Sequence, residues 1–267
     1  YSTTLPAPVQ DPAIDPRFWL LCAFLHRGGH FWHFWFKQNK QSFWYSADVA
    51  GAVPETYTLR YDTYFTVSPV GTGADRGTYD KSHNADICAV NCLYADYDAK
   101  DFSGGLAAIL DHLDGLPLRP SVTVFSGGGL QCYWLAAVPW LCSEPEARNA
   151  ARLLQSAWVN LVGADQGAKD LARILRVPGT WNHKPEYGSP YRVCFLHCDL
   201  DRLYTWDELM GAAADELATA QHQGQKEVVF EHSGAGGRTA LTRDDQELID
   251  LAIREFPVKG PKLGRLM

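Results

Sequence analysis

Apolar residues along the chain follow two spacings, one typical of strands and one typical of helices. The run from Ile87 to Tyr94 is apolar and β-prone, and it predicts a buried strand. Further strands are predicted over residues 57–70, 120–125, 133–138 and 191–195. Apolar residues three or four positions apart predict helices over residues 103–116, 144–162 and 206–220, with Ser103 as a candidate N-cap. The chain therefore combines strands and helices.

Aromatic side chains crowd residues 17–45. Aromatic rings bury large areas and dominate packing, so we expect most of them in a core. A platform on which bases stack is the other interpretation. His30 and His33 have a spacing that would suit a metal pair on a helix, but among so many aromatics we expect them at the polar rim of that core.

Composition describes an ordinary globular protein, with 46% hydrophobic and 21% charged residues. No apolar run approaches the roughly 20 residues of a membrane span, so no membrane partner is expected. The net charge of −7 argues against general coating of nucleic acid. It permits a local basic groove, or a site whose positive charge comes from metal ions.

Seven scattered cysteines fit reduced thiols in a cytosol, and we expect a cytoplasmic protein. A zinc site at Cys88 and Cys92, or at Cys194, His197 and Cys198, is a weak alternative. Neither set has the C-x₂-C pairing of a zinc site.

Glycines and charges mark the boundaries of the chain's parts. Residues 223–240 are predicted to be a linker, and residues 241–267 the start of a following helical module that is cut short. The preceding 222 residues are expected to form the main domain. We divide that domain into an aromatic-rich module over residues 1–80 and a second module over residues 81–222.

Two acids end the strongest predicted strand. Asp96 and Asp98 lie two positions apart, and residues with that spacing on a strand point to the same side. Two carboxylates held so close repel each other unless a cation neutralises them. Mg²⁺ is often held by one or two carboxylates, together with water and phosphate oxygens. The alternative is that both acids simply enter a turn.

Three consecutive glycines lie between two predicted strands. Ser126, Gly127, Gly128 and Gly129 could form a turn whose backbone binds a ligand closely, with Gln131 just beyond it. A flexible hairpin without a ligand is the other interpretation.

An acid and three cations follow one another closely further along. Asp170 precedes Arg173, Arg176 and Lys184. Guanidinium groups bind phosphate oxygens through two parallel hydrogen bonds, so the cations suit a triphosphate. An internal Asp–Arg ion pair is the alternative.

Taken together, these three stretches resemble the archaeo-eukaryotic primase superfamily, in the branch of phage and plasmid replication proteins. The family's motifs are a strand ending in D-x-D, then S-G-x-G-h-H-x-Y-W, then D-x-x-R-h-h-R-h-P-G-T-x-N-x-K. Here they correspond to Asp96–Asp98, Ser126–Trp134 and Asp170–Lys184. The resemblance covers roughly residues 60–200. Gln131 stands where the family has a histidine that contacts nucleotide phosphate, and an amide can donate a hydrogen bond but carries no charge.

The resemblance implies an α+β fold, with an RRM-like antiparallel sheet that carries the acids and packs on an N-terminal α/β module. It implies a DNA primase or DNA polymerase that acts in replication of a phage, plasmid or other mobile element in a bacterial host cell. Two Mg²⁺ or Mn²⁺ ions would be held by Asp96, Asp98 and Asp170.

The same resemblance assigns nucleotide binding to eight residues: Ser126, Gly127, Gly128, Gly129, Gln131, Arg173, Arg176 and Lys184. The implied partners are dNTP or NTP, a single-stranded DNA template, a primer strand and a downstream helicase. A non-catalytic binding module of the same fold and a two-metal nuclease are the alternatives.

Overall fold

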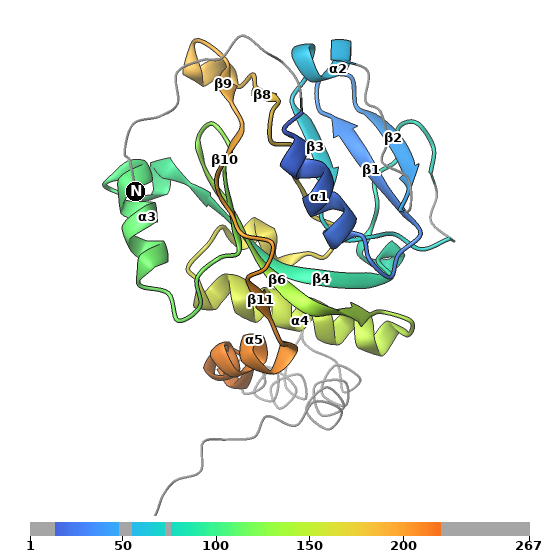
Figure 1. Cartoon of the computed structure of the whole chain (residues 1–267), viewed down its shortest axis with the longest axis vertical. Helices are drawn as coiled ribbons and strands as arrows, with labels where there is room; N and C mark the ends of the chain where they lie inside the picture. Colours follow the sequence, from blue (N-terminus) through green and yellow to red (C-terminus); the bar gives the residue numbers. More distant parts are fainter. Residues whose placement is uncertain (1–13, 48–54, 73–75, 220–267) are drawn as a thin grey trace, which may run out of the picture.

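The structure is a computed structural model that describes residues 14–47, 55–72 and 76–219 (Figure 1). The predicted linker and the predicted module over residues 241–267 lie outside the described residues. Among the described residues, no helix has both the length and the apolar character needed to cross a membrane.

A five-stranded sheet forms the centre of the molecule. Its strands are β4 (Ala89–Asp98), β5 (Val122–Phe125), β6 (Gly129–Leu141), β10 (Cys194–Cys198) and β11 (Leu203–Tyr204). The long strand β6 pairs antiparallel with β4 along its length and antiparallel with β5, which in turn pairs with β10. The short strand β11 runs parallel to β6.

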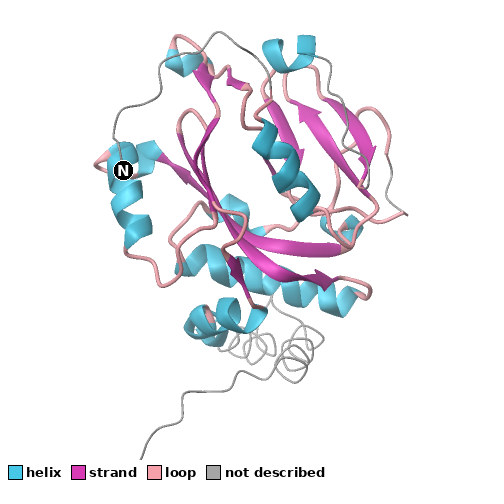
Figure 2. Ribbon diagram, viewed as in Figure 1, coloured by secondary structure: helices cyan, strands magenta, loops and turns pink. Residues whose placement is uncertain are grey.

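A second sheet of four antiparallel strands lies beside the first (Figure 2). Its order is β2 (Gln41–Ser46), β1 (Phe31–Phe36), β3 (Thr63–Thr66) and β7 (Ile174–Arg176). Strand β7 comes from the second half of the chain, so the β3–β7 pairing crosses the predicted module boundary near residue 80. That division stays a prediction.

Helices flank the two sheets. They are α1 (Pro16–Leu25), α2 (Glu55–Arg60), α3 (Gly105–Asp114), α4 (Pro145–Leu161) and α5 (Trp206–Ala212). A small hairpin pairs β8 (Trp181–Asn182) with β9 (Tyr191–Arg192). Short 3₁₀ turns are η1 (Asn84–Asp86), η2 (Ala99–Asp101), η3 (Gln166–Lys169) and η4 (Pro185–Tyr187).

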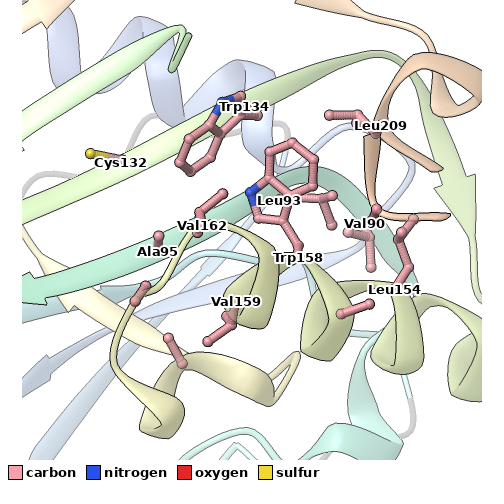
Figure 3. Close-up of a cluster of buried hydrophobic side chains, with 14 of the residues drawn as sticks. Val90, Leu93, Ala95, Cys132, Trp134, Leu154, Trp158, Val159, Val162 and Leu209 are labelled. Atoms are coloured by element: carbon pink, nitrogen blue, oxygen red, sulfur yellow. The ribbon is translucent and has the colours of Figure 1, made fainter. Parts of the chain in front are cut away.

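One hydrophobic core lies between α4 and the central sheet (Figure 3). Trp158 projects from α4 and meets Trp134 of β6 edge-to-face, with ring centroids 5.1 Å apart. Leu93 of β4 lies next to them, and all three side chains are fully buried. The helical spacing of apolar residues in α4 therefore serves this contact, and the predicted helix over residues 144–162 is confirmed.

A second core lies between the two sheets and α1, and it contains much of the aromatic run. Phe18 of α1 packs edge-to-face on Phe65 of β3 at 4.9 Å and also contacts Phe34 of β1. The prediction that these aromatics form a core is confirmed. His33 lies on strand β1 rather than on a helix, and it is fully buried rather than at a rim, so burial lowers its pKa to about 3.

Alternation along β4 sorts its side chains between these two cores. Leu93, Ala95 and Tyr97 face the α4 core, whereas Tyr94 belongs to the core between the sheets. Because side chains alternate along a strand, Asp96 lies on the same side as Tyr94, away from α4. The two acids of the strand therefore point toward the second sheet.

Several predicted boundaries differ from the structure. Helix α3 begins at Gly105, and its N-cap is Gly104 rather than Ser103. Residues 57–70 are helical first, in α2, and extended only in β3. Strand β6 begins at Gly129 instead of residue 133, because Gly129 and Leu130 pair with Asp98 and Tyr97 of β4. Helix α5 ends at Ala212, and residues 214–219 are helical again after a turn at Ala213, so the predicted helix over residues 206–220 is interrupted there.

The three glycines permit close packing. A Cβ on Gly129 would lie 1.8 Å from the carbonyl oxygen of Tyr97, and a Cβ on Gly128 would lie 1.8 Å from the Tyr187 hydroxyl. Gly127 has a φ of +95°, a conformation that side chains disfavour. The turn between β5 and β6 is therefore a packed element, and glycine is required by the neighbours of each position.

These contacts predict different costs for two alanine substitutions. Gly129→Ala should lower the free energy of unfolding by about 3 kcal/mol or more, since the clash is with backbone that cannot move away. Gly128→Ala should cost clearly less, because the Tyr187 side chain can turn aside. Urea unfolding followed by circular dichroism measures both, with the exposed Gly211→Ala as control. Equal losses for Gly128→Ala and Gly129→Ala would contradict the packing argument.

Candidate active site

Two of the three sequence stretches lie on neighbouring strands. In the β4–β6 register, Asp96 lies opposite Gln131 and Asp98 lies opposite Gly129. Residues paired across antiparallel strands share a face of the sheet, so Gln131 lies on the same face as the acids. The pairing of two strands thus brings the D-x-D pair next to the glycine turn.

Backbone and amide hydrogen bonds attach the third stretch, and Asp165 just before it, to the other two. The N–H of Arg176 donates to Gln131 Oε1 at 3.1 Å. The Asn182 amide donates to the carbonyl oxygen of Ser126 at 2.7 Å. The N–H of Asp165 donates to the carbonyl oxygen of Asp96 at 2.9 Å. The Gln131 side-chain oxygen therefore holds β7 in position, while the residue itself lies opposite Asp96.

A pocket of about 260 Å³ lies where these segments meet. Most of the side chains predicted from the sequence line it: Asp96, Asp98, Ser126, Gly128, Gln131, Arg173, Arg176 and Lys184. Gly127, Gly129 and Asp170 do not line it. The pocket also includes residues that sequence reasoning did not select, namely Tyr64, Tyr97, Asp165, Ile174, Asn182 and Tyr187.

Asp165 is the acid that sequence reasoning missed. It lines the pocket with Asp96 and Asp98, and its backbone is tied to Asp96. Both acids are at least partly exposed to solvent and accept a hydrogen bond at 3.0 Å, Asp170 from Arg173 Nε and Asp165 from the Gly167 N–H, so only their position relative to the pocket distinguishes them. The available signal was an acid just after helix α4 and five residues before Asp170.

The acids have opposite electrostatic environments. The pKa of Asp96 is raised to about 6, chiefly by burial; the charges of Arg173 and Arg176 lower it, and those of Asp165 and Asp98 raise it. Burial also opposes ionisation of Asp98, but the hydrogen bond and charge of Lys100 outweigh it, so the pKa is lowered. Lys100 Nζ lies 2.7 Å from Asp98. A proton and a metal cation would therefore compete for the Asp96 carboxylate.

Arg176 has a structural partner that the sequence did not indicate. Its Nη1 donates to Asp62 Oδ1 at 2.8 Å, and both side chains are almost completely buried. Asp62 also accepts from the His183 N–H at 2.7 Å and from the Gln38 amide at 3.1 Å. Among the described residues, Arg176 Nη2 is buried without a hydrogen-bond partner. One nitrogen thus anchors the segment, while the guanidinium group also lies over the Tyr64 ring, with its carbon 4.7 Å from the ring centroid.

The remaining cations have weaker ties. Arg173 pairs with Asp170, as the internal ion-pair interpretation predicted. Lys184 Nζ lies 3.6 Å from Glu186 and is one-third exposed. Contacts of this kind between partly exposed groups contribute little stability, so both side chains can change partner at small cost.

The donor set suits a hard cation with incomplete protein coordination. Asp96 and Asp98 supply carboxylate oxygens from one face of β4, and the raised pKa of Asp96 marks a half-buried carboxylate short of positive charge. Within the described residues, no three His, Cys, Asp or Glu side chains are grouped closely enough to hold an ion by themselves. That fits Mg²⁺ or Mn²⁺ with water or phosphate oxygens in the other positions. The zinc alternative concerned other residues, Cys88 and Cys92 or Cys194, His197 and Cys198, and in the described part of the chain neither set belongs to a group of three or more such side chains placed to hold an ion.

Comparison of the sequence with family models and with curated proteins gave no match. Among solved structures, the AEP domain of the cyanophage S-2L primase-polymerase aligns with 76% of this chain and 100% of its own, with a TM-score of 0.54 and 20% identity. Primase RepB′ aligns at 15% identity and a TM-score of 0.44, covering 81% of this chain and 68% of that one. The catalytic domain of RepB′ in complex with initiator DNA aligns at 15% identity and a TM-score of 0.42. That alignment covers 78% of this chain and 98% of the RepB′ chain.

The cyanophage alignment shows that the described chain has the fold of a primase-polymerase AEP domain. The predicted α+β fold class is therefore confirmed, and so is the resemblance inferred from the three motifs, at the level of fold.

The Asp62–Arg176 pair predicts a strongly non-additive response. Asp62→Ala should destabilise the fold by about 3–5 kcal/mol, because it leaves a buried guanidinium without its counter-ion. Arg176→Ala should behave similarly, and the double variant should lose much less than the sum. Unfolding free energies of the four proteins give the coupling energy. Additive losses would show that the pair contributes no net interaction.

The raised pKa of Asp96 predicts a pH-dependent stability. Its folded pKa of about 6 exceeds the unfolded value, so ionisation is costly only in the folded state. Without divalent ions, Asp96→Asn should match wild type near pH 4 and become more stable as pH rises through 6, by about 3 kcal/mol at most. Unfolding across pH 4–8 measures the difference, with the exposed Asp101→Asn as control. A constant difference between Asp96→Asn and wild type would contradict the assignment.

Proposed function

We propose that this domain is a template-directed nucleotidyltransferase, a DNA primase or DNA polymerase that serves replication of a phage, plasmid or other mobile element. The observation that carries the proposal is the pocket itself: carboxylates, two arginines and a lysine meet in it, on the fold of a primase-polymerase domain.

Asp96 and Asp98 are the proposed ligands of Mg²⁺ or Mn²⁺. A pair of such ions would polarise the attacking 3′-hydroxyl and neutralise the leaving pyrophosphate. Asp170 was predicted as the third acid, and that assignment stays a prediction. Asp165 is the alternative that pocket geometry favours, because it lines the pocket with the first two acids and Asp170 does not.

The cations are proposed to hold the triphosphate. Arg173 and Lys184 are bound weakly enough to move onto phosphate oxygens, and Arg176 keeps one buried nitrogen without a partner among the described residues. The Ser126 N–H already donates to the Gly129 carbonyl, so a contact from Ser126 would use its hydroxyl. Gln131 is proposed to contact phosphate through its neutral amide.

The proposed partners are dNTP or NTP, a single-stranded template, a primer strand and a helicase that follows this domain. Phosphate contacts dominate affinity for DNA, and the chain carries a net charge of −7. We therefore propose that this chain by itself binds template weakly.

Two other functions use the same residues differently. A non-catalytic module would bind nucleotide and leave DNA unchanged, and the neutral Gln131 favours it slightly. A two-metal nuclease would cleave DNA with the same acids. Incubation of the chain with labelled dNTP or NTP, primed template and Mn²⁺ separates the three functions. A transferase extends the primer, a nuclease cleaves the DNA, and a non-catalytic module gives neither product. A parallel reaction without primer separates priming from extension.

The acid assignments predict graded losses of extension. Asp96→Asn with Asp98→Asn should reduce extension by about 100-fold or more, since the charges that hold the ions are removed while the side-chain shapes are kept. Asp165→Asn should cause a loss of similar size, and Asp170→Asn a smaller one. Primer extension at saturating dNTP measures all three, with Asp101→Asn as control.

Near-normal extension by the Asp96/Asp98 double variant would contradict the proposed activity. A larger loss of extension for Asp170→Asn than for Asp165→Asn would identify Asp170 as the third acid, as inferred from the sequence.

A further inference from the structure

A second pocket of about 360 Å³ adjoins the first. The two share four lining residues, namely Asp98, Gly128, Lys184 and Tyr187. One extended molecule can therefore contact both pockets. The volume falls within the range of small-molecule sites, about 300–1,000 Å³.

The chemistry of the second pocket differs from that of the first. Aromatic rings and one aliphatic side chain contribute to its walls, from Phe125, Tyr187, Tyr191 and Leu106. Tyr191 meets Phe125 and Tyr187 edge-to-face, at centroid distances of 6.2 Å and 5.2 Å. The Tyr191 side chain is nevertheless 39% exposed, which leaves part of an otherwise apolar group open to a ligand.

The aromatic wall is held in place by the glycine turn. Asn182, which pairs with Tyr191 in the β8–β9 hairpin, donates its amide to the Ser126 carbonyl. A Cβ on Gly127 would come within 3.1 Å of Tyr191 Cβ, and Gly128 touches the Tyr187 hydroxyl. The glycines thus let the hairpin pack directly on the turn that separates the two pockets.

We propose that the second pocket binds the base and sugar of the nucleoside triphosphate whose phosphates lie in the acid pocket. The inference rests on the proposed function, because that function assigns the triphosphate to Arg173, Arg176 and Lys184. The continuity of the two pockets favours one ligand with a charged end and a flat aromatic end. A nucleotide has both ends, whereas an apolar peptide has no counterpart for the first pocket.

Stacking explains what this subsite would discriminate. Every base has a flat face that an aromatic ring can contact, so stacking holds bases without selecting among them. The charged side chains that line it are paired with one another, Lys100 with Asp98 and Lys184 with Glu186, so they are not set to read one base edge. The subsite therefore binds all four nucleotides with similar affinity, as a template-directed enzyme requires.

Titration calorimetry with Mn²⁺ tests the subsite on the full chain, without turnover. Tyr191→Ala should weaken dNTP binding about tenfold, the effect of losing one stacking contact, for each of the four bases. Inorganic tripolyphosphate lacks a base, so its affinity should stay unchanged. Tyr191→Phe should bind dNTP like wild type. Tyr79→Ala is the matched control, because Tyr79 is a 68% exposed tyrosine that lines neither pocket.

The outcomes separate this inference from the proposed activity. Unchanged dNTP affinity in Tyr191→Ala, or equal losses for dNTP and tripolyphosphate, would overturn the subsite. If either result is found while primer extension still depends on Asp96 and Asp98, the proposed function is kept and only the subsite is rejected. If Tyr191→Ala weakens binding of dNTP but not of tripolyphosphate, and the chain never extends a primer, the subsite would be supported and the proposed transferase activity would be wrong.

Discussion

The pairing of β4 with β6 is the constraint on which the molecule depends. It sets Asp96 opposite Gln131 and Asp98 opposite Gly129, and it also fills the core against α4 through the alternate side chains. A shift of one residue would turn the acids toward Trp158 and the apolar residues toward the pocket, because side chains alternate along a strand. Gly129 makes this register possible, since no side chain fits against the Tyr97 carbonyl. Stability and chemistry therefore depend on the same register.

Charge is buried in two ways around the site. Asp62 and Arg176 neutralise each other, and they fasten β7 and the segment that begins at His183 to the first half of the chain. Asp96 has no comparable neutralisation, because Asp98 and Asp165 add negative charge beside it. The paired charges make a rigid frame, and the unbalanced acids within that frame favour a cation.

The two adjoining pockets differ in the character of their linings. Acids and cations line the first, and tyrosine and phenylalanine rings line much of the second. The packed glycine turn lies between them. Its glycines were predicted to supply backbone donors to phosphate, and their contacts add a second reason for the motif: larger residues would displace the Tyr187 and Tyr191 wall. Backbone donation from the turn stays a prediction.

Local pattern determined much of the fold by itself. The buried strand before Asp96, the helix over residues 145–161 and the aromatic core follow from periodicity and burial, which involve near neighbours in sequence. The same-side placement of Asp96 and Asp98 follows from strand geometry alone. Tertiary structure decided the rest. The partner of Arg176 is Asp62, 114 positions away, and no local spacing encodes such a contact. Asp165 and Asp170 look alike in sequence, and only the path of the chain after α4 brings Asp165 beside Asp96. Long-range pairing depends on how whole elements pack, which is why it required the structure.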